Sequence, residues 1–138
     1  CDIDGVIIPD MPLNDYVIKF SHLFEKSNLS FISLISPNTS DKRIKEIDII
    51  SRGFIYVVSS SSITGKRSDF SNEQINYFKR VNNLKLINPK IIGFGISGKN
   101  TFKSACKYSN GAIIGTSFIK ALSENNLKES INKYISAD

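Results

Sequence analysis

Apolar and polar positions divide the chain into five repeats of one two-part pattern. Each repeat opens with a short apolar run rich in β-branched residues and continues with apolar residues at helical spacing. The strand-like runs cover residues 3–9, 30–36, 53–58, 90–95 and 112–115. The helix-like segments lie at about 14–24, 40–50, 72–81 and 99–108, and then over 117–122 and 127–135. Asn14 or Asp15 can cap the first of these segments, and Ser40 and Ser71 are the expected caps of the second and third.

Strands that alternate with helices of this length predict a parallel sheet with right-handed crossovers. The runs are apolar almost throughout, as strands covered on both faces must be. We therefore expect an α/β fold, a (β/α)8 TIM barrel of which residues 1–138 form one partial domain of about five β–α units. Five units are too few to close a barrel, and the first run starts almost at Cys1, so we expect an N-terminal portion of the barrel to be absent.

Two consecutive strand-like runs end in the same way. Residues 90–95 end at Gly95 with Ser97 close behind, and residues 112–115 end at Gly115 followed by Thr116. A strand that breaks at Gly and opens a helix presents free backbone N–H groups to an anion. Two such turns in neighbouring units predict a shared phosphate site, as in the last two units of a barrel. The alternative is a pair of tight connections that bind nothing.

The longest connection runs from residue 59 to 70 and is rich in Ser. Thr64 and Gly65 lie within it, and a long loop after a barrel strand is typical of a lid that closes over substrate. An ordinary Ser-rich loop is the alternative. Lys66 and Arg67 could meet a phosphate, but a surface position is the preferred interpretation for both.

Charge and composition argue against several classes of function. The net charge is +5, but fourteen of the eighteen basic residues are Lys scattered along the helical segments, which predicts a solvated surface and not a nucleic-acid site. Cys1 and Cys106 form no disulfide or metal pattern, which is typical of the reducing cytosol. The chain shows no secretory signal and no run long enough to cross a membrane.

Few side chains are candidates for acid–base chemistry. Asp10 is the only carboxylate placed at the end of a strand-like run, and a loop-capping role is the preferred interpretation over a catalytic one. The sole His, His22, falls in the middle of a helical segment, and no His/Cys/Asp cluster has metal-ligand spacing. A barrel half with a phosphate site and no acid–base pair is expected to bind and not to break bonds.

Six segments together resemble one known family. They are residues 4–12, 36–39, 53–59 and 63–65, the run Gly93-Phe94-Gly95-Ile96-Ser97, and residues 111–117. In this order and spacing they are similar to the C-terminal part of tryptophan synthase alpha subunits, from about the fourth barrel strand onward. The resemblance covers essentially the whole chain.

The resemblance implies a cytoplasmic lyase of tryptophan biosynthesis that cleaves indole-3-glycerol phosphate to indole and glyceraldehyde 3-phosphate. It implies an alpha2beta2 tetramer in which the beta subunit carries pyridoxal phosphate and this subunit carries no cofactor. By the same match, the phosphate ligands are Gly65, Gly95, Gly115 and Thr116, the pocket residues are Tyr56, Phe94 and Leu34, and the lid residue is Thr64.

The catalytic Glu and Asp of the family lie upstream of this sequence, so the chain holds no catalytic residue and is expected to be inactive alone. Two features depart from the family: residues 59–62 are all Ser where the family commonly has an Arg and a Gly, and Thr116 stands where Ser is usual. Two alternatives stay open, namely another phosphate-binding barrel and a non-catalytic binding or regulatory subunit.

Overall fold

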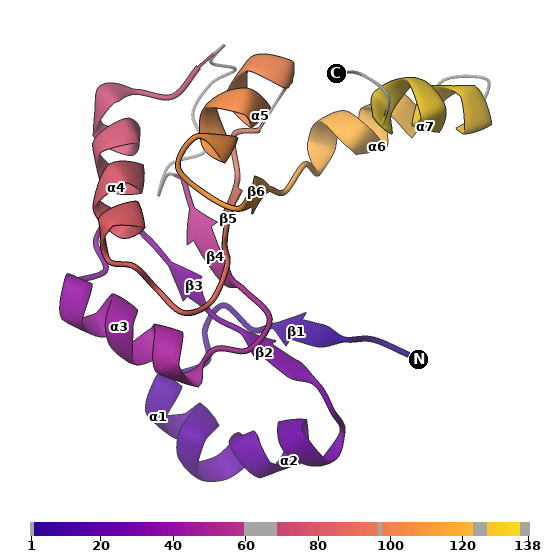
Figure 1. The fold of residues 1–138 in the computed structure, drawn as a ribbon. Helices are drawn as coiled ribbons and strands as arrows, with labels where there is room; N and C mark the ends of the chain where they lie inside the picture. Colours follow the sequence, from indigo (N-terminus) through magenta and orange to yellow (C-terminus); the bar gives the residue numbers. More distant parts are fainter. Residues whose placement is uncertain (1, 60–68, 97, 123–126, 136–138) are drawn as a thin grey trace.

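The described strands form two parallel sheets, one of two strands and one of four, and the strands of each follow one another in chain order (Figure 1). The computed structural model describes residues 2–59, 69–96, 98–122 and 127–135. β1 pairs with β2, β3 with β4, β4 with β5 and β5 with β6, and each of these pairings is parallel. The strands are β1 (Gly5–Ile7), β2 (Ser30–Ile32), β3 (Leu34–Ile35), β4 (Ile55–Val58), β5 (Lys90–Gly93) and β6 (Gly111–Ala112).

All five predicted strand runs are present, each shorter than its apolar run, and the second divides in two at Ser33. The division arises because β2 pairs with β1, whereas β3 pairs with β4. The Ser33 carbonyl accepts a hydrogen bond from the Tyr56 N–H at 2.9 Å, so the chain stays bonded to β4 through the break. Consecutive parallel strands with intervening helices are the arrangement of a partial (β/α)8 barrel, which confirms the predicted fold class.

The helices that follow β3 and β4 begin directly after the serines predicted to cap them. The Ser40 hydroxyl accepts a hydrogen bond from the Arg43 N–H at 3.3 Å, and Ser71 and Gln74 form a reciprocal capping box. The helical elements are α1 (Leu13–Asp15), the π-helical turn η1 (Tyr16–Phe20), α2 (Ser21–Lys26), α3 (Asp41–Ile50), α4 (Asn72–Asn83), α5 (Lys99–Cys106), α6 (Thr116–Leu122) and α7 (Leu127–Ile135).

The first helical segment differs from its prediction. It begins at Leu13, directly after Pro12, and not behind a cap at residue 14 or 15. The π-turn changes the spacing, so that Leu13 and Tyr16 are buried while Val17 and Ile18 are exposed. None of the helices in the described ranges is long and apolar enough to cross a bilayer.

The core lies between one face of the sheet and helices α3 and α4 (Figure 1). On β4, Ile55 and Val57 are no more than 1% exposed and belong to this core. Tyr56 and Val58, which alternate with them, are only partly buried on the opposite face. Other core residues on the helix-covered side are Phe31, Ile35, Ile44, Ile47, Tyr77, Phe78, Val81, Ile92 and Ala105.

Tyr77 on α4 carries a hydroxyl that is buried without a hydrogen-bond partner among the described residues. Burial raises the pKa of Tyr77 well above its usual value, and the nearby Arg80 guanidinium offsets this only in part. An unfolded tyrosine loses its proton near pH 10, whereas Tyr77 keeps it in the folded chain. Its contribution to stability is therefore fully present below pH 10 and is lost as pH rises above that value.

We predict that Tyr77→Phe lessens alkaline destabilisation by roughly 1 kcal/mol per pH unit above pH 10. At neutral pH the free energy of unfolding should stay the same or rise by up to about 1 kcal/mol, since an unpaired buried hydroxyl is removed. Urea unfolding at pH 8 and pH 11 measures both effects, with Tyr108→Phe, at a partly exposed position, as the control. If the free energy of unfolding falls between pH 8 and pH 11 as much in Tyr77→Phe as in the parent chain, a raised pKa of Tyr77 is contradicted.

Candidate functional site

The two glycine turns lie at the same edge of the sheet. Ile92 of β5 is the register partner of Ala112 of β6, and Gly95 and Gly115 each follow three residues later. Since the strands are parallel, both turns emerge side by side at the carboxyl ends of their strands. Both glycines are exposed at this edge.

The turn after β5 has an unusual backbone. Phe94 and Gly95 both lie in the left-handed region, with φ of 65° and 72°. Glycine adopts this conformation readily, whereas a bulky L residue such as Phe adopts it rarely and with backbone strain. The turn leaves the Phe94 ring 53% exposed beside the open face of the sheet.

The three predicted pocket residues come together on the face of the sheet opposite the core. Leu34 is the register partner of Tyr56 across β3 and β4. The rings of Tyr56 and Phe94 meet edge to face, with centroids 5.9 Å apart. The Tyr56 hydroxyl is protonated at neutral pH, as in any tyrosine, and can donate a hydrogen bond; partial burial raises its pKa further. The cluster therefore offers an apolar wall with one polar tip.

Gly93 makes room for the Tyr56 ring. A Cβ atom added at Gly93 would overlap the Tyr56 hydroxyl and ring carbons. From the sequence, Gly93 is only the first residue of the Gly93–Ser97 motif. Its packing role depends on the contact between β5 and Tyr56 of β4, which the sequence does not predict. The position of Tyr56 over β5 thus requires glycine at residue 93.

Leu34 also borders a cavity of about 180 Å³ next to the loop that follows β1. Arg43 and Ile47 of α3 line it together with Ser33, whose hydroxyl is buried without a hydrogen-bond partner among the described residues. The remaining lining is apolar and consists of Ile8, Pro9, Met11, Pro12, Leu13 and Phe31.

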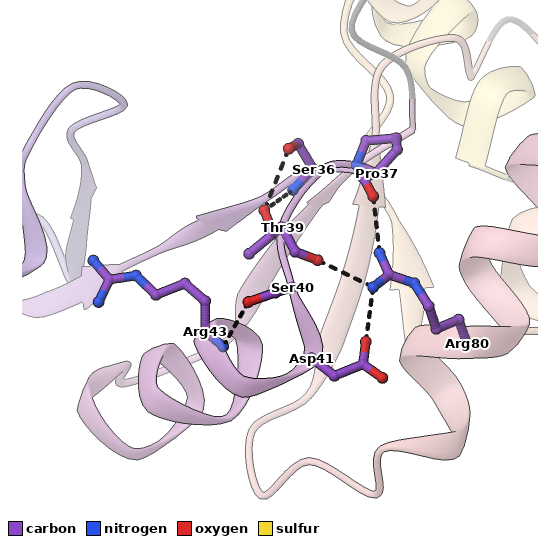
Figure 2. A network of polar contacts seen from close by, with 7 residues as sticks. All are labelled: Ser36, Pro37, Thr39, Ser40, Asp41, Arg43 and Arg80. Atoms are coloured by element: carbon purple, nitrogen blue, oxygen red, sulfur yellow. Dashed lines mark hydrogen bonds and ion pairs between the residues drawn. The ribbon is translucent and has the colours of Figure 1, made fainter.

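Arg80 on α4 holds the loop that follows β3, a contact that the sequence did not predict (Figure 2). Its guanidinium donates to the carbonyls of Pro37 and Thr39 at 2.9 and 3.1 Å and pairs with Asp41 at 2.7 Å. The Thr39 hydroxyl in turn accepts the Ser36 N–H at 3.0 Å. These bonds fix the first loop beyond Leu34 to the helix that follows β4.

The other predicted residues fall in different places. Gly115 accepts the Ile119 N–H at 3.1 Å through its carbonyl, and Thr116 is the first residue of α6. Thr64 and Gly65, with Lys66 and Arg67, lie outside the described residues. Asp10 is exposed in a turn after β1. Within the described ranges, no group of three His, Cys, Asp or Glu residues is placed to hold a metal ion.

Comparison with known proteins decides the family. The family model described as tryptophan synthase alpha chain matches residues 1–137. This chain belongs to the tryptophan synthase alpha chain family. The match agrees with the resemblance drawn from the six sequence segments and removes the alternative of another phosphate-binding barrel.

Curated tryptophan synthase alpha chains from two flavobacteria are close relatives. The one from Flavobacterium psychrophilum is 53% identical over 134 residues, and the one from Flavobacterium johnsoniae is 56% identical over 123 residues. These alignments cover 97% and 89% of this chain but only 53% and 49% of the relatives. The chain thus spans about half the length of the curated alpha chains it matches.

Solved alpha subunits share the fold. The tryptophan synthase subunit alpha from Campylobacter jejuni superposes with a TM-score of 0.77 at 28% identity, over 96% of this chain and 52% of that one. An alpha-subunit from Pyrococcus furiosus superposes with a TM-score of 0.73 at 23% identity, over 96% and 55%. The partial-barrel architecture is therefore that of the tryptophan synthase alpha chain.

We predict that Gly93→Ala destabilises the alpha chain by roughly 1–3 kcal/mol, because the new methyl group displaces the Tyr56 ring. Gly98→Ala is the matched control, since a Cβ there meets nothing within 4 Å. The control should cost less than about 1 kcal/mol of unfolding free energy, the loss expected from Ala as a poorer N-cap of α5. Adding Tyr56→Leu to Gly93→Ala should recover part of the loss, and equal effects of the two Ala variants in urea unfolding would argue against this packing.

Proposed function

We propose that the alpha chain carrying this sequence cleaves indole-3-glycerol phosphate to indole and glyceraldehyde 3-phosphate in the biosynthesis of tryptophan. The observation that carries the proposal is one of placement. Two exposed glycine turns lie at the same sheet edge, beside the Tyr56 and Phe94 ring pair. An anion site next to an aromatic wall suits a substrate with a phosphate at one end and an indole at the other.

The phosphate end is assigned to backbone groups. Gly95, Gly115 and Thr116 would donate to the phosphate oxygens, and family membership adds Gly65. The support from geometry is the exposure of the first three residues at adjacent strand ends. Backbone N–H donors near a helix start suit a phosphate dianion, since they carry partial positive charge without mobile side chains.

The indole end is assigned to Tyr56, Phe94 and Leu34. Edge-to-face contact between the two rings leaves an apolar surface on which a flat aromatic group can pack. Leu34 extends this surface across the neighbouring strand. The Phe94 ring stands beside Gly95, so one turn serves both ends of the substrate.

The bond-breaking groups are assigned to a portion of the protein upstream of this sequence. Retro-aldol cleavage needs a base for the glycerol hydroxyl and a proton donor for the indole ring, both of which carboxyl groups can supply. The family's Glu and Asp perform these roles in the preceding barrel strands. This chain supplies binding energy remote from the breaking bond, which orients the substrate, and the 138 residues alone are proposed to be inactive.

The partners follow from the same assignment. The beta subunit would contact the loop side of the barrel, receive indole and use its own pyridoxal phosphate to join indole to serine. The proposed assembly is the cytoplasmic alpha2beta2 tetramer, with no cofactor in the alpha subunit. Thr64 would act as the lid residue that positions the catalytic carboxylate when substrate is bound.

Gly95→Asp in the full-length alpha chain tests the phosphate site. A carboxylate at this position should repel the phosphate and raise KM for indole-3-glycerol phosphate at least roughly a hundredfold, as expected for unscreened like charges in contact. Gly53→Asp is the matched control, because Gly53 has φ of 86° and carries the same backbone strain away from the site. An unchanged KM in Gly95→Asp would refute the assignment.

The unmodified full-length chain tests the activity itself. Cleavage of indole-3-glycerol phosphate, faster with the beta subunit present, is the expected result. Binding of the substrate without turnover, even with the beta subunit, would instead favour a non-catalytic regulatory subunit.

Thr64→Val tests the lid assignment. Loss of the hydroxyl should lower kcat by roughly tenfold or more, the effect of one missing hydrogen bond to a catalytic group, while affinity for glycerol 3-phosphate changes less than about twofold. Thr64→Ser keeps the hydroxyl and should retain most of kcat. Equal losses of kcat and affinity in Thr64→Val would contradict the lid role.

A further inference from the structure

Ser59 joins the end of β4 to the turn that follows β5. It directly follows Val58, is 1% exposed, and uses all three of its polar groups. Its N–H donates to the Gly93 carbonyl at 3.1 Å, and its hydroxyl donates to the Phe94 carbonyl at 2.7 Å. Its own carbonyl accepts the Gln74 side-chain amide at 3.1 Å. A buried serine with every group paired is a rigid anchor.

Ser59 is hydrogen-bonded to the residue of the turn whose backbone is strained. Phe94 has φ of 65°, which an L side chain adopts only when its surroundings hold it there. The Ser59 hydroxyl bonds the carbonyl of that same residue, and lies 3.6 Å from where a Cβ on Gly95 would stand. The Ser59 hydroxyl therefore lies next to both left-handed residues.

Gln74 ties the anchor to α4. Its side-chain oxygen accepts the Ser71 N–H at 2.8 Å as part of the capping box, while its side-chain nitrogen reaches the Ser59 carbonyl. Phe70, just before the cap, packs edge to face on Phe78 in the core at 5.0 Å. The start of α4 thus fixes Ser59, and Ser59 fixes the turn.

We propose that Ser59 is a positioning residue for the reaction. Its hydroxyl holds Phe94 and Gly95 in the left-handed conformation, so that the Phe94 ring stays against Tyr56 and the Gly95 N–H faces the substrate phosphate. This inference rests on the proposed function, because it assigns Ser59 through the ligand-binding turn. Ser59 itself touches neither the substrate nor the reacting atoms.

Three variants of the full-length alpha chain test the inference. Ser59→Ala removes the hydroxyl, and Ser59→Thr keeps it. Ser51→Ala is the matched control, since Ser51 is also buried, at 6% exposure, lies before β4 instead of after it, and makes no side-chain hydrogen bond among the described residues. The first measurement is the Kd of glycerol 3-phosphate, which carries the phosphate end of the proposed substrate. The second is the nuclear Overhauser effect between the Tyr56 and Phe94 rings, which reports the turn without any reaction.

In Ser59→Ala the Kd should rise roughly tenfold, the effect of one hydrogen bond between buried groups, and the ring-to-ring signal should weaken. Ser59→Thr and Ser51→Ala should keep both values within about twofold of the parent. Loss of thermal stability in Ser59→Ala with an unchanged Kd would show that Ser59 only supports the fold, and would overturn the inference.

The result separates this inference from the proposed function. A parent chain that cleaves indole-3-glycerol phosphate while Ser59→Ala keeps the parent Kd overturns the role of Ser59 alone. A parent chain that neither binds glycerol 3-phosphate nor cleaves the substrate contradicts the proposed function, and the inference with it.

Discussion

The parallel pairing of β4 with β5 is the constraint on which the site depends. It places Val58 beside Gly93, and therefore lets the Tyr56 ring lie over the one residue on β5 that has no side chain. Just beyond the last paired residues, Ser59 bonds the backbone of β5 and of its turn. A shift of one residue in this register would turn Tyr56 into the core and separate Ser59 from Phe94.

The two faces of the sheet differ in how deeply their side chains are buried. The face covered by α3 and α4 is closed by aliphatic and aromatic side chains such as Ile55, Val57 and Phe78, each at most 1% exposed. The other face carries Leu34, Tyr56 and Phe94, which are only partly buried or exposed. Alternation along each strand thus allows stability and the proposed ligand contact to be set by different residues of the same strand.

The proposed function divides substrate binding and bond cleavage between different parts of the barrel. The described residues present two glycine turns and an aromatic wall, while the proposed acid and base belong to strands upstream. Barrels permit this division because every strand delivers its functional groups to one common edge. Arg80 contributes by holding the loop after β3 at that edge, through two backbone carbonyls and Asp41.

The sequence by itself determined the order of strands and helices, the caps at Ser40 and Ser71, and the two glycine turns. These features depend on local periodicity and on backbone conformations that few residue types favour, so they can be read without knowing the fold. The pocket trio and the phosphate ligands came from family resemblance, and only the placement of the described members is visible in the fold. The tertiary structure alone decided that Val17 and Ile18 face outward, that Gly93 accommodates Tyr56, and that Ser59 and Arg80 hold turns far from them in sequence. Each of these depends on contacts between elements distant along the chain, and such contacts leave no periodic or local signal in the amino-acid pattern.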